Sequence, residues 1–221
     1  DGETAEYLGE GNVDDDGTAD GAPEYVRAMH AELPTLRVIR HARTGGQSAA
    51  IRTGVTAAAS EVVATMDGDG QNDPHDIPGL LAKLGEPGGD GPALVNGVRT
   101  NRIGKASVRW ASRSANFIRD SILKDDCPDT GCGIKVYWRD AFLRLPFFTS
   151  IHRYLPALFQ TYGLKVDYAP VNDRPRLAGV SKYSNLGRAL IGLYDLIGVS
   201  WLRKRTVVPG IATDSGETKQ A

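Results

Sequence analysis

The stretch from Glu61 to Pro74, EVVATMDGDGQNDP, decides the fold prediction for this chain. Its first residues form a compact, mostly apolar run of strand length. The run ends abruptly at Asp67-Gly68-Asp69-Gly70, which is a turn composition. Parallel sheets bind ligands beyond the carboxyl ends of their strands. The stretch therefore predicts a buried strand that delivers the carboxylates of Asp67 and Asp69 to a ligand site.

The spacing of Asp67 and Asp69 has two interpretations. Carboxylates one residue apart can bind one hard cation through oxygen, while the intervening glycine lets a diphosphate approach closely. The alternative is an acidic surface turn, because D-G-D-G is also a common turn composition. A calcium EF-hand is excluded, since Pro78 stands where the twelfth loop residue would be glutamate and a strand precedes the loop.

Predicted helices and strands alternate on both sides of this stretch. Apolar residues at three- and four-residue steps favour helices, and short apolar runs favour strands. Such alternation is typical of an α/β fold with a mostly parallel sheet and helices on both faces. We expect one domain over residues 1–205 and a polar tail over 206–221. The predicted helices are 23–33, 47–59, 74–84, 105–123, 152–162 and 183–205, and the predicted strands are 36–41, 61–66, 93–98, 133–138 and 165–171.

The composition excludes several classes of function. The 221 residues carry a formal net charge of -1, so there is no overall basic field for non-specific nucleic-acid binding. The longest apolar stretch, residues 189–202, contains Asp195 and is shorter than the ~20 residues that a spanning helix needs. No signal-peptide pattern is visible. Cys127 and Cys132 lack the spacing of a redox pair, so we expect packing thiols in a reducing, cytoplasmic compartment.

Basic residues follow the predicted strand 93–98 and continue every four residues along the next predicted helix. Arginine makes bidentate, charge-assisted hydrogen bonds to phosphate oxygens, so these residues could clamp a phosphate. A solvated helix face is the alternative. The cluster consists of Arg99, Arg102, Lys105, Arg109 and Arg113.

Four blocks, in this order along the chain, carry a resemblance to a known family. They resemble the polyprenyl-phosphate branch of the family 2 (GT-A) glycosyltransferases, of which dolichol-phosphate mannosyltransferase is the best-known type. The first looks like the D-D-G-S-T-D-G turn and the second like the D-x-D-x-Q-x-x-P block of that branch, while the others are similar to its acceptor-side and diphosphate-side segments. The blocks are Asp15–Gly21 (DDGTADG), Asp67–Pro74 (DGDGQNDP), Asp129–Lys135 (DTGCGIK) and Arg174–Tyr183 (RPRLAGVSKY).

The resemblance implies a Rossmann-like GT-A fold and transfer of a sugar from a GDP- or UDP-sugar to a polyprenyl phosphate or related lipid-linked acceptor, assisted by Mg2+ or Mn2+. It also implies a role for each matching position. Asp15 and Asp16 would approach the base and ribose, and Asp67 would lie beside the nucleotide. The metal would be held by Asp69 and Gln71 with Asp67 nearby, the diphosphate would meet Arg176, Ser181 and Lys182, and the acceptor phosphate would meet Arg99, Arg109 and Arg113.

The chemistry of the acceptor decides whether a base is needed. A phosphate monoester is already ionised near neutral pH, so it can attack the anomeric carbon once cations offset the repulsion between the two anions. A sugar hydroxyl would need a carboxylate as general base, and Asp129 is the candidate.

The closing helix, residues 183–205, ends in Arg203-Lys204-Arg205. Its apolar residues suit an interfacial helix whose basic end meets anionic lipids, which predicts a peripheral protein at the inner face of the membrane. Packing of the same residues against the core is the alternative.

Some positions depart from the family pattern. Relatives begin with an apolar strand, whereas Asp1–Glu10 has no apolar run, so we expect a GT-A fold without its first strand. The strand expected just before Asp15 is weak, because residues 9–13 offer a single apolar side chain where an inner parallel strand needs several. Asp173 stands where relatives often carry histidine, and Thr44-Gly45-Gly46 replaces an asparagine-containing turn. The rival from another class is a non-catalytic remnant that binds nucleotide or phosphate weakly. A sugar nucleotidyltransferase is less favoured, because its glycine-rich opening loop is absent, and the oligomeric state stays open.

Overall fold

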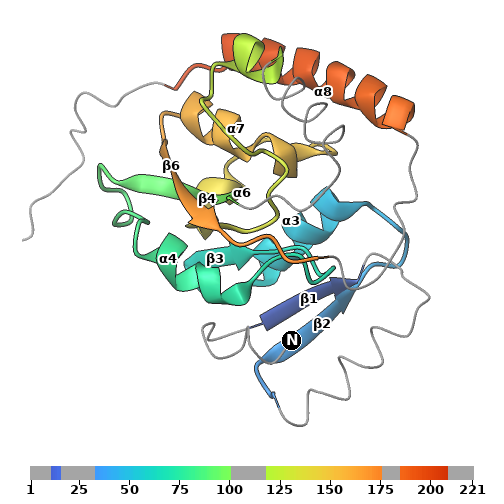
Figure 1. Ribbon diagram of the computed structural model, residues 1–221, viewed down its shortest axis with the longest axis vertical. Coiled ribbons are helices and arrows are strands. Elements are labelled where there is room, and N and C mark those ends of the chain that lie inside the picture. The colour runs from blue at the N-terminus through green and yellow to red at the C-terminus, as the bar shows by residue number, and fades with distance from the viewer. Residues whose placement is uncertain (1–10, 16–32, 101–117, 176–184, 209–221) are drawn as a thin grey trace, which may run out of the picture.

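The computed structural model describes residues 11–15, 33–100, 118–175 and 185–208, whose helices and strands form an α/β arrangement (Figure 1). The predicted helix 23–33 lies almost entirely outside these residues. Of the predicted helix 105–123, only residues 118–123 are described, and they are helical.

The described strands are β1 (Gly11–Asp15), β2 (Leu36–Arg40), β3 (Val62–Thr65), β4 (Pro92–Arg99), β5 (Lys135–Trp138) and β6 (Lys165–Val171). Five of the six described strands lie close to the predicted positions, and the sixth, β1, is not among the strands that apolar runs predict. Four of them form a sheet in the order β3-β5-β4-β6, and β1 and β2 form a separate parallel pair. Within the larger sheet β4 and β6 are parallel, whereas β5 is antiparallel to both of its neighbours.

The α/β class is confirmed, but the expectation of a mostly parallel sheet needs correction, because the described sheet is mixed. Arg99 at the end of β4 is hydrogen-bonded to Asp129, which lies in the loop that leads into β5. The chain therefore re-enters the sheet at the edge where β4 ends, and β5 has to run back. A strand buried on both faces is equally apolar in either direction, so its sequence does not reveal this.

Helices cover both faces of the sheet, as predicted (Figure 1). Their positions follow from the alternation of side chains along the strands. Leu94 and Tyr137, paired across β4 and β5, belong to the cluster that packs under α3, α7 and α8, while Val95 and Val136 belong to the cluster that includes α4. The helical elements are α3 (Gln47–Ala57), η1 (Pro74–Asp76), α4 (Ile77–Leu81), α6 (Arg139–Leu143), η2 (Ile151–Arg153), α7 (Leu155–Thr161) and α8 (Asn185–Arg205).

Two local predictions have mixed outcomes. Asp73 caps the helical segment after Asp67-Gly68-Asp69-Gly70 as expected, since its side chain accepts a hydrogen bond from the His75 amide. The segment is a 3-10 turn followed by the short α4 rather than one helix over 74–84, because Pro78 and Gly79 are poor helix formers.

The weak strand before Asp15 does form, as β1, because the ladder to β2 uses backbone groups that every residue except proline supplies.

None of the helices in the described parts of the chain is both long enough and apolar enough to cross a membrane.

Candidate functional site

Strand ends from three parts of the chain meet at one edge of the sheet. Thr65 at the end of β3 pairs with Lys135 at the start of β5, which also pairs with Asn96 of β4. Arg99 at the end of β4 pairs with Val171 at the end of β6. The predicted second, third and fourth blocks therefore all begin or end at this edge, which we call the carboxyl edge.

Asp67 leaves β3 in a fixed position. Its backbone N–H donates to Asn72 Oδ1 at 2.8 Å, and its Oδ1 accepts from Gln47 Nε2 at 2.7 Å. The backbone of Gly133 faces the carboxylate so closely that a Cβ there would fall 2.4 Å from Asp67 Oδ2. Gln47, Asn72 and Gly133 thus hold one of the predicted site residues from three separate segments.

Gln47 is a site residue that the sequence reasoning missed. It is the first residue of α3, directly after Gly46, whose φ of 82° favours glycine. The Gly45-Gly46 turn ahead of an alanine-rich helix was a local signal that this helix begins close to another backbone. Nothing in the local sequence shows that the Gln47 side chain reaches a residue 20 positions away.

The electrostatics of Asp67 reflect a crowded, half-buried carboxylate. Burial raises the pKa of Asp67, and the nearby charge of Asp69 raises it further, while Lys135 and Arg99 oppose the rise. Asp69 forms a tight turn in which its Oδ1 accepts from the Gln71 amide at 3.1 Å. Two carboxylates whose charges repel each other are an arrangement that a divalent cation relieves.

The donor set at this turn suits a hard cation. Asp67, Asp69 and Gln71 offer only oxygen ligands from their side chains, which is the preference of Mg2+ and similar ions. Within the described parts of the chain, no group of three histidine, cysteine, aspartate or glutamate residues forms a ready-made metal site. A cation here would therefore need ligands beyond the two carboxylates, such as an amide oxygen, water or a bound diphosphate.

Arg99 and Asp129, predicted for different tasks, are brought together. Arg99 Nε and Nη2 donate to the two carboxylate oxygens of Asp129 at 2.7 and 2.8 Å. Burial opposes ionisation, but the hydrogen bonds and charge of Asp129 raise the pKa of Arg99. Asn96 Nδ2 donates to the Asp129 carbonyl at 3.2 Å and so anchors the loop that carries Asp129.

The second and fourth blocks are joined by backbone contacts. The Arg174 amide donates to the Gln71 carbonyl at 2.9 Å, and Asn72 and Asp173 form an antiparallel bridge. Arg174 Nη2 also lies 2.7 Å from Asp73 Oδ1. The loop that leads toward Arg176 therefore begins beside the Asp67–Pro74 block.

The first predicted block is described only at Asp15, the last residue of β1, whose backbone pairs with Arg40 of β2. The predicted residues that lie outside the described part of the chain are Asp16, Arg102, Lys105, Arg109, Arg113, Arg176, Ser181 and Lys182.

The two cysteines are buried free thiols, as expected for packing residues. Burial raises the pKa of Cys127 to about 11 and also raises the pKa of Cys132, so neither behaves as a reactive thiolate.

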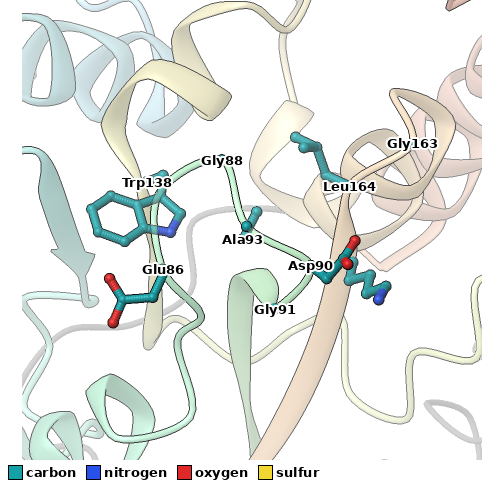
Figure 2. Close-up of a pocket in the computed structure, with 10 residues that line it drawn as sticks. Glu86, Gly88, Asp90, Gly91, Ala93, Trp138, Gly163 and Leu164 are labelled. Carbon is teal, nitrogen blue, oxygen red and sulfur yellow. The ribbon is translucent and has the colours of Figure 1, made fainter. Parts of the chain in front are cut away.

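A small pocket lies away from the carboxyl edge. It encloses about 140 Å³ and is lined by the loop 86–91, Trp138 and the turn at Gly163–Lys165. Figure 2 shows Trp138 beside Glu86, with Asp90 and Leu164 across from them. The pocket contains none of the predicted site residues.

Comparisons with known proteins bear on the same segments. A family model described as glycosyl transferase family 2 matches residues 13–145. The dodecaprenyl-phosphate galacturonate synthase of Rhizobium johnstonii is 31% identical over 200 residues, which is 89% of this chain and 58% of that protein. The undecaprenyl-phosphate 4-deoxy-4-formamido-L-arabinose transferase of Pseudomonas syringae is 32% identical over 185 residues, or 83% of this chain and 53% of that protein. The chain thus spans little more than half the length of these relatives.

Solved structures share the fold. Glucosyl-3-phosphoglycerate synthase from Mycobacterium tuberculosis, in complex with Mn2+, UDP and glucosyl-3-phosphoglycerate, aligns with a TM-score of 0.64 at 16% identity, over 89% of this chain and 69% of that one. The same enzyme with phosphoglyceric acid aligns with a TM-score of 0.61 at 17% identity, over 86% and 66% of the two chains. Since the family model spans β1 through α6, including the strand end that carries Asp67 and Asp69, the chain belongs to glycosyl transferase family 2.

Proposed function

We propose that this chain is the catalytic domain of a glycosyltransferase that moves a sugar from a nucleotide-sugar onto a polyprenyl phosphate or related lipid-linked phosphate. The observation that carries the proposal is the meeting of Asp67 and Arg99 at one sheet edge, which places a turn with two carboxylates beside a partly buried arginine. The relatives named for dodecaprenyl- and undecaprenyl-phosphate support the acceptor class.

On the donor side, Asp69, Gln71 and Asp67 would hold Mg2+ or Mn2+. The ion would supply positive charge for the leaving nucleotide diphosphate. The mycobacterial neighbour that was solved with Mn2+ and UDP supports this assignment. The remaining donor contacts follow from the family pattern, with Asp15 and Asp16 at the base and ribose and Arg176, Ser181 and Lys182 at the diphosphate.

On the acceptor side, Arg99 would bind the lipid phosphate, together with Arg109 and Arg113. A phosphate acceptor arrives ionised, so the site has to supply position and positive charge rather than a base. The pair with Arg99 favours a positioning role for Asp129, because both of its carboxylate oxygens already accept hydrogen bonds. A base role for Asp129 with a hydroxyl acceptor would require this pair to open.

At the membrane, α8 would lie on the anionic inner surface and bring the site to the lipid head groups. Leu196 and Val199 are buried against the core, whereas Tyr194, Ile197 and Trp201 are 80, 62 and 63% exposed. The predicted alternatives, core packing and an interfacial face, are thus both compatible with α8, one on each side of the helix. Its last turn carries Arg203, which donates a hydrogen bond to the Leu123 carbonyl, and the exposed Lys204 and Arg205, which suit anionic lipids.

The test is a transfer assay on the purified chain with UDP- and GDP-sugars, Mn2+ and undecaprenyl phosphate in detergent. We expect a lipid-extractable glycosyl product that Asp69→Ala abolishes and that the distant, exposed Asp90→Ala leaves unchanged. Metal-dependent donor binding without product would favour a non-catalytic binding domain, and binding of neither donor would contradict the proposal.

A further inference from the structure

A buried lysine lies at the carboxyl edge without an assigned role. Lys135 begins β5, between Thr65 of β3 and Asn96 of β4, and the residue is 3% exposed. Its Nζ donates a hydrogen bond to the Cys132 carbonyl. An ammonium group out of water is costly unless nearby negative charge compensates it, so its surroundings have to explain why it is there.

Lys135 faces the carboxylates of the site. Side chains alternate along β5, so Lys135 shares a sheet face with Tyr137, whose cluster packs under α3. Gln47 at the start of α3 holds Asp67 from that side. Burial lowers the pKa of Lys135, whereas the neighbouring acidic groups Cys132, Asp67, Cys127 and Asp129 oppose this fall.

Two other acidic groups near the edge have cationic partners of their own. Asp129 is paired with Arg99, and Asp73 with Arg174. Asp67 instead accepts from the neutral amide of Gln47, and the charge of Lys135 acts on it more strongly than that of Arg99. Lys135 is thus the main internal counter-charge to Asp67 among the described residues.

We propose that Lys135 is a positioning residue, an internal counter-cation of the Asp67–Asp69 turn, which makes the site favour a cation together with a diphosphate over a bare cation. The inference rests on the proposed function. With Lys135 the two carboxylates and the ammonium sum to one negative charge, so a divalent ion leaves a positive site for a diphosphate. Without it the carboxylates attract a bare cation more strongly, and the metal-free site repels an anion.

Two binding measurements on the whole chain separate this role from a structural one. One calorimetric titration would measure the binding of MnCl2 without nucleotide. A second set would measure the binding of UDP, and of GDP in parallel, without metal in the presence of EDTA. We expect Lys135→Met to bind Mn2+ on the order of fivefold more tightly and metal-free UDP on the order of fivefold more weakly. Lys135→Arg, which keeps the charge, should restore both affinities toward wild type. The control is Lys165→Met, an exposed lysine at the opposite end of β6.

Opposite shifts in a folded Lys135→Met protein would support the proposal even if its melting temperature falls, because removing one member of a buried charge pair leaves the other without its counter-charge. Equal affinities, or a joint loss of both, would overturn it. Lys135→Gln is the second uncharged variant if Lys135→Met fails to fold, and failure of both variants to fold would also overturn it, since it would make Lys135 a folding determinant. If the wild-type chain binds neither Mn2+ nor nucleotide, the proposed function fails, and this inference fails with it.

Discussion

The guanidinium of Arg99 donates hydrogen bonds to both carboxylate oxygens of Asp129, and the side chains of Arg99 and Asp129 are only 16 and 6% exposed. The pair links the end of β4 to the loop that enters β5. A basic and an acidic residue that the sequence suggested for separate roles in acceptor chemistry therefore form one unit in the folded chain.

Replacing Asp129 with asparagine should affect binding of the acceptor more than the chemical step. Asparagine keeps the shape but removes the charge that orients Arg99, so we expect KM for undecaprenyl phosphate to rise about tenfold with a smaller change in kcat. Steady-state kinetics with varied lipid phosphate measure this. A large fall in kcat at unchanged KM, with a shifted pH profile, would instead identify Asp129 as a base.

Replacing Gly133 with alanine should disable the site and destabilise the protein. The new Cβ would fall 2.4 Å from Asp67 Oδ2 and 2.6 Å from Asn72 Oδ1, so these groups have to move. We expect a loss of about 1–3 kcal/mol in the free energy of unfolding and loss of metal-dependent nucleotide binding. Urea denaturation and calorimetry would measure the two effects. Gly79→Ala is the control, because a Cβ at Gly79 meets nothing within 4 Å.

Replacing Gln47 with alanine should weaken donor binding with little cost in stability. The side chain is exposed and its hydrogen bond to Asp67 is worth roughly 1 kcal/mol, so metal-dependent nucleotide affinity should fall several-fold. The matched control is Thr56→Ala on the same helix, whose hydroxyl bonds only the Arg52 carbonyl among the contacts that the structure gives. Equal affinities of the two variants would show that Gln47 does not hold Asp67 in solution.

His152 should make the stability depend on pH. Burial lowers its pKa to about 3, and its Nδ1 lies 2.8 Å from Ser48 Oγ. Between about pH 6.5 and 3 the unfolded chain binds a proton that the folded chain does not, so stability falls as pH decreases, by at most about 1.4 kcal/mol per pH unit. In His152→Asn the slope of unfolding free energy against pH should be smaller over this range. An identical slope in both proteins would count against a neutral, buried His152.

Replacing Ile197 with glutamate should reduce membrane binding and leave the fold intact. Ile197 is 62% exposed, whereas Leu196 and Val199 of the same helix are buried, so replacing Ile197 costs little packing. We expect weaker sedimentation with vesicles that contain about 30% anionic phosphatidylglycerol, a surface that attracts basic segments. The melting temperature should stay close to wild type. Val207→Glu, on an exposed residue just after the helix, tests whether the effect belongs to the helix face.

Local sequence patterns predict most of the helices and strands and the Asp67–Pro74 block. The apolar run before Asp67 predicted β3, the alternating segments predicted β4 and β6 almost to the residue, and Asp73 was recognised as a cap. These features depend on side-chain patterns within a few residues, because helix and strand periodicity and capping are local properties. The four family blocks are also short local patterns, so the resemblance to family 2 glycosyltransferases can be recognised from the sequence. The matching family model confirms that family.

The direction of β5 and the side-chain partners at the carboxyl edge follow from the fold and not from any local pattern. The direction depends on the edge at which the loop before β5 re-enters the sheet, which no periodicity encodes. Gln47 reaches Asp67, Arg99 pairs with Asp129, and Lys135 becomes buried beside them because strands distant in sequence end at one edge. Residues that meet there owe their hydrogen bonds, charge balance and pKa shifts to the fold, since these depend on distance and burial rather than on position along the chain.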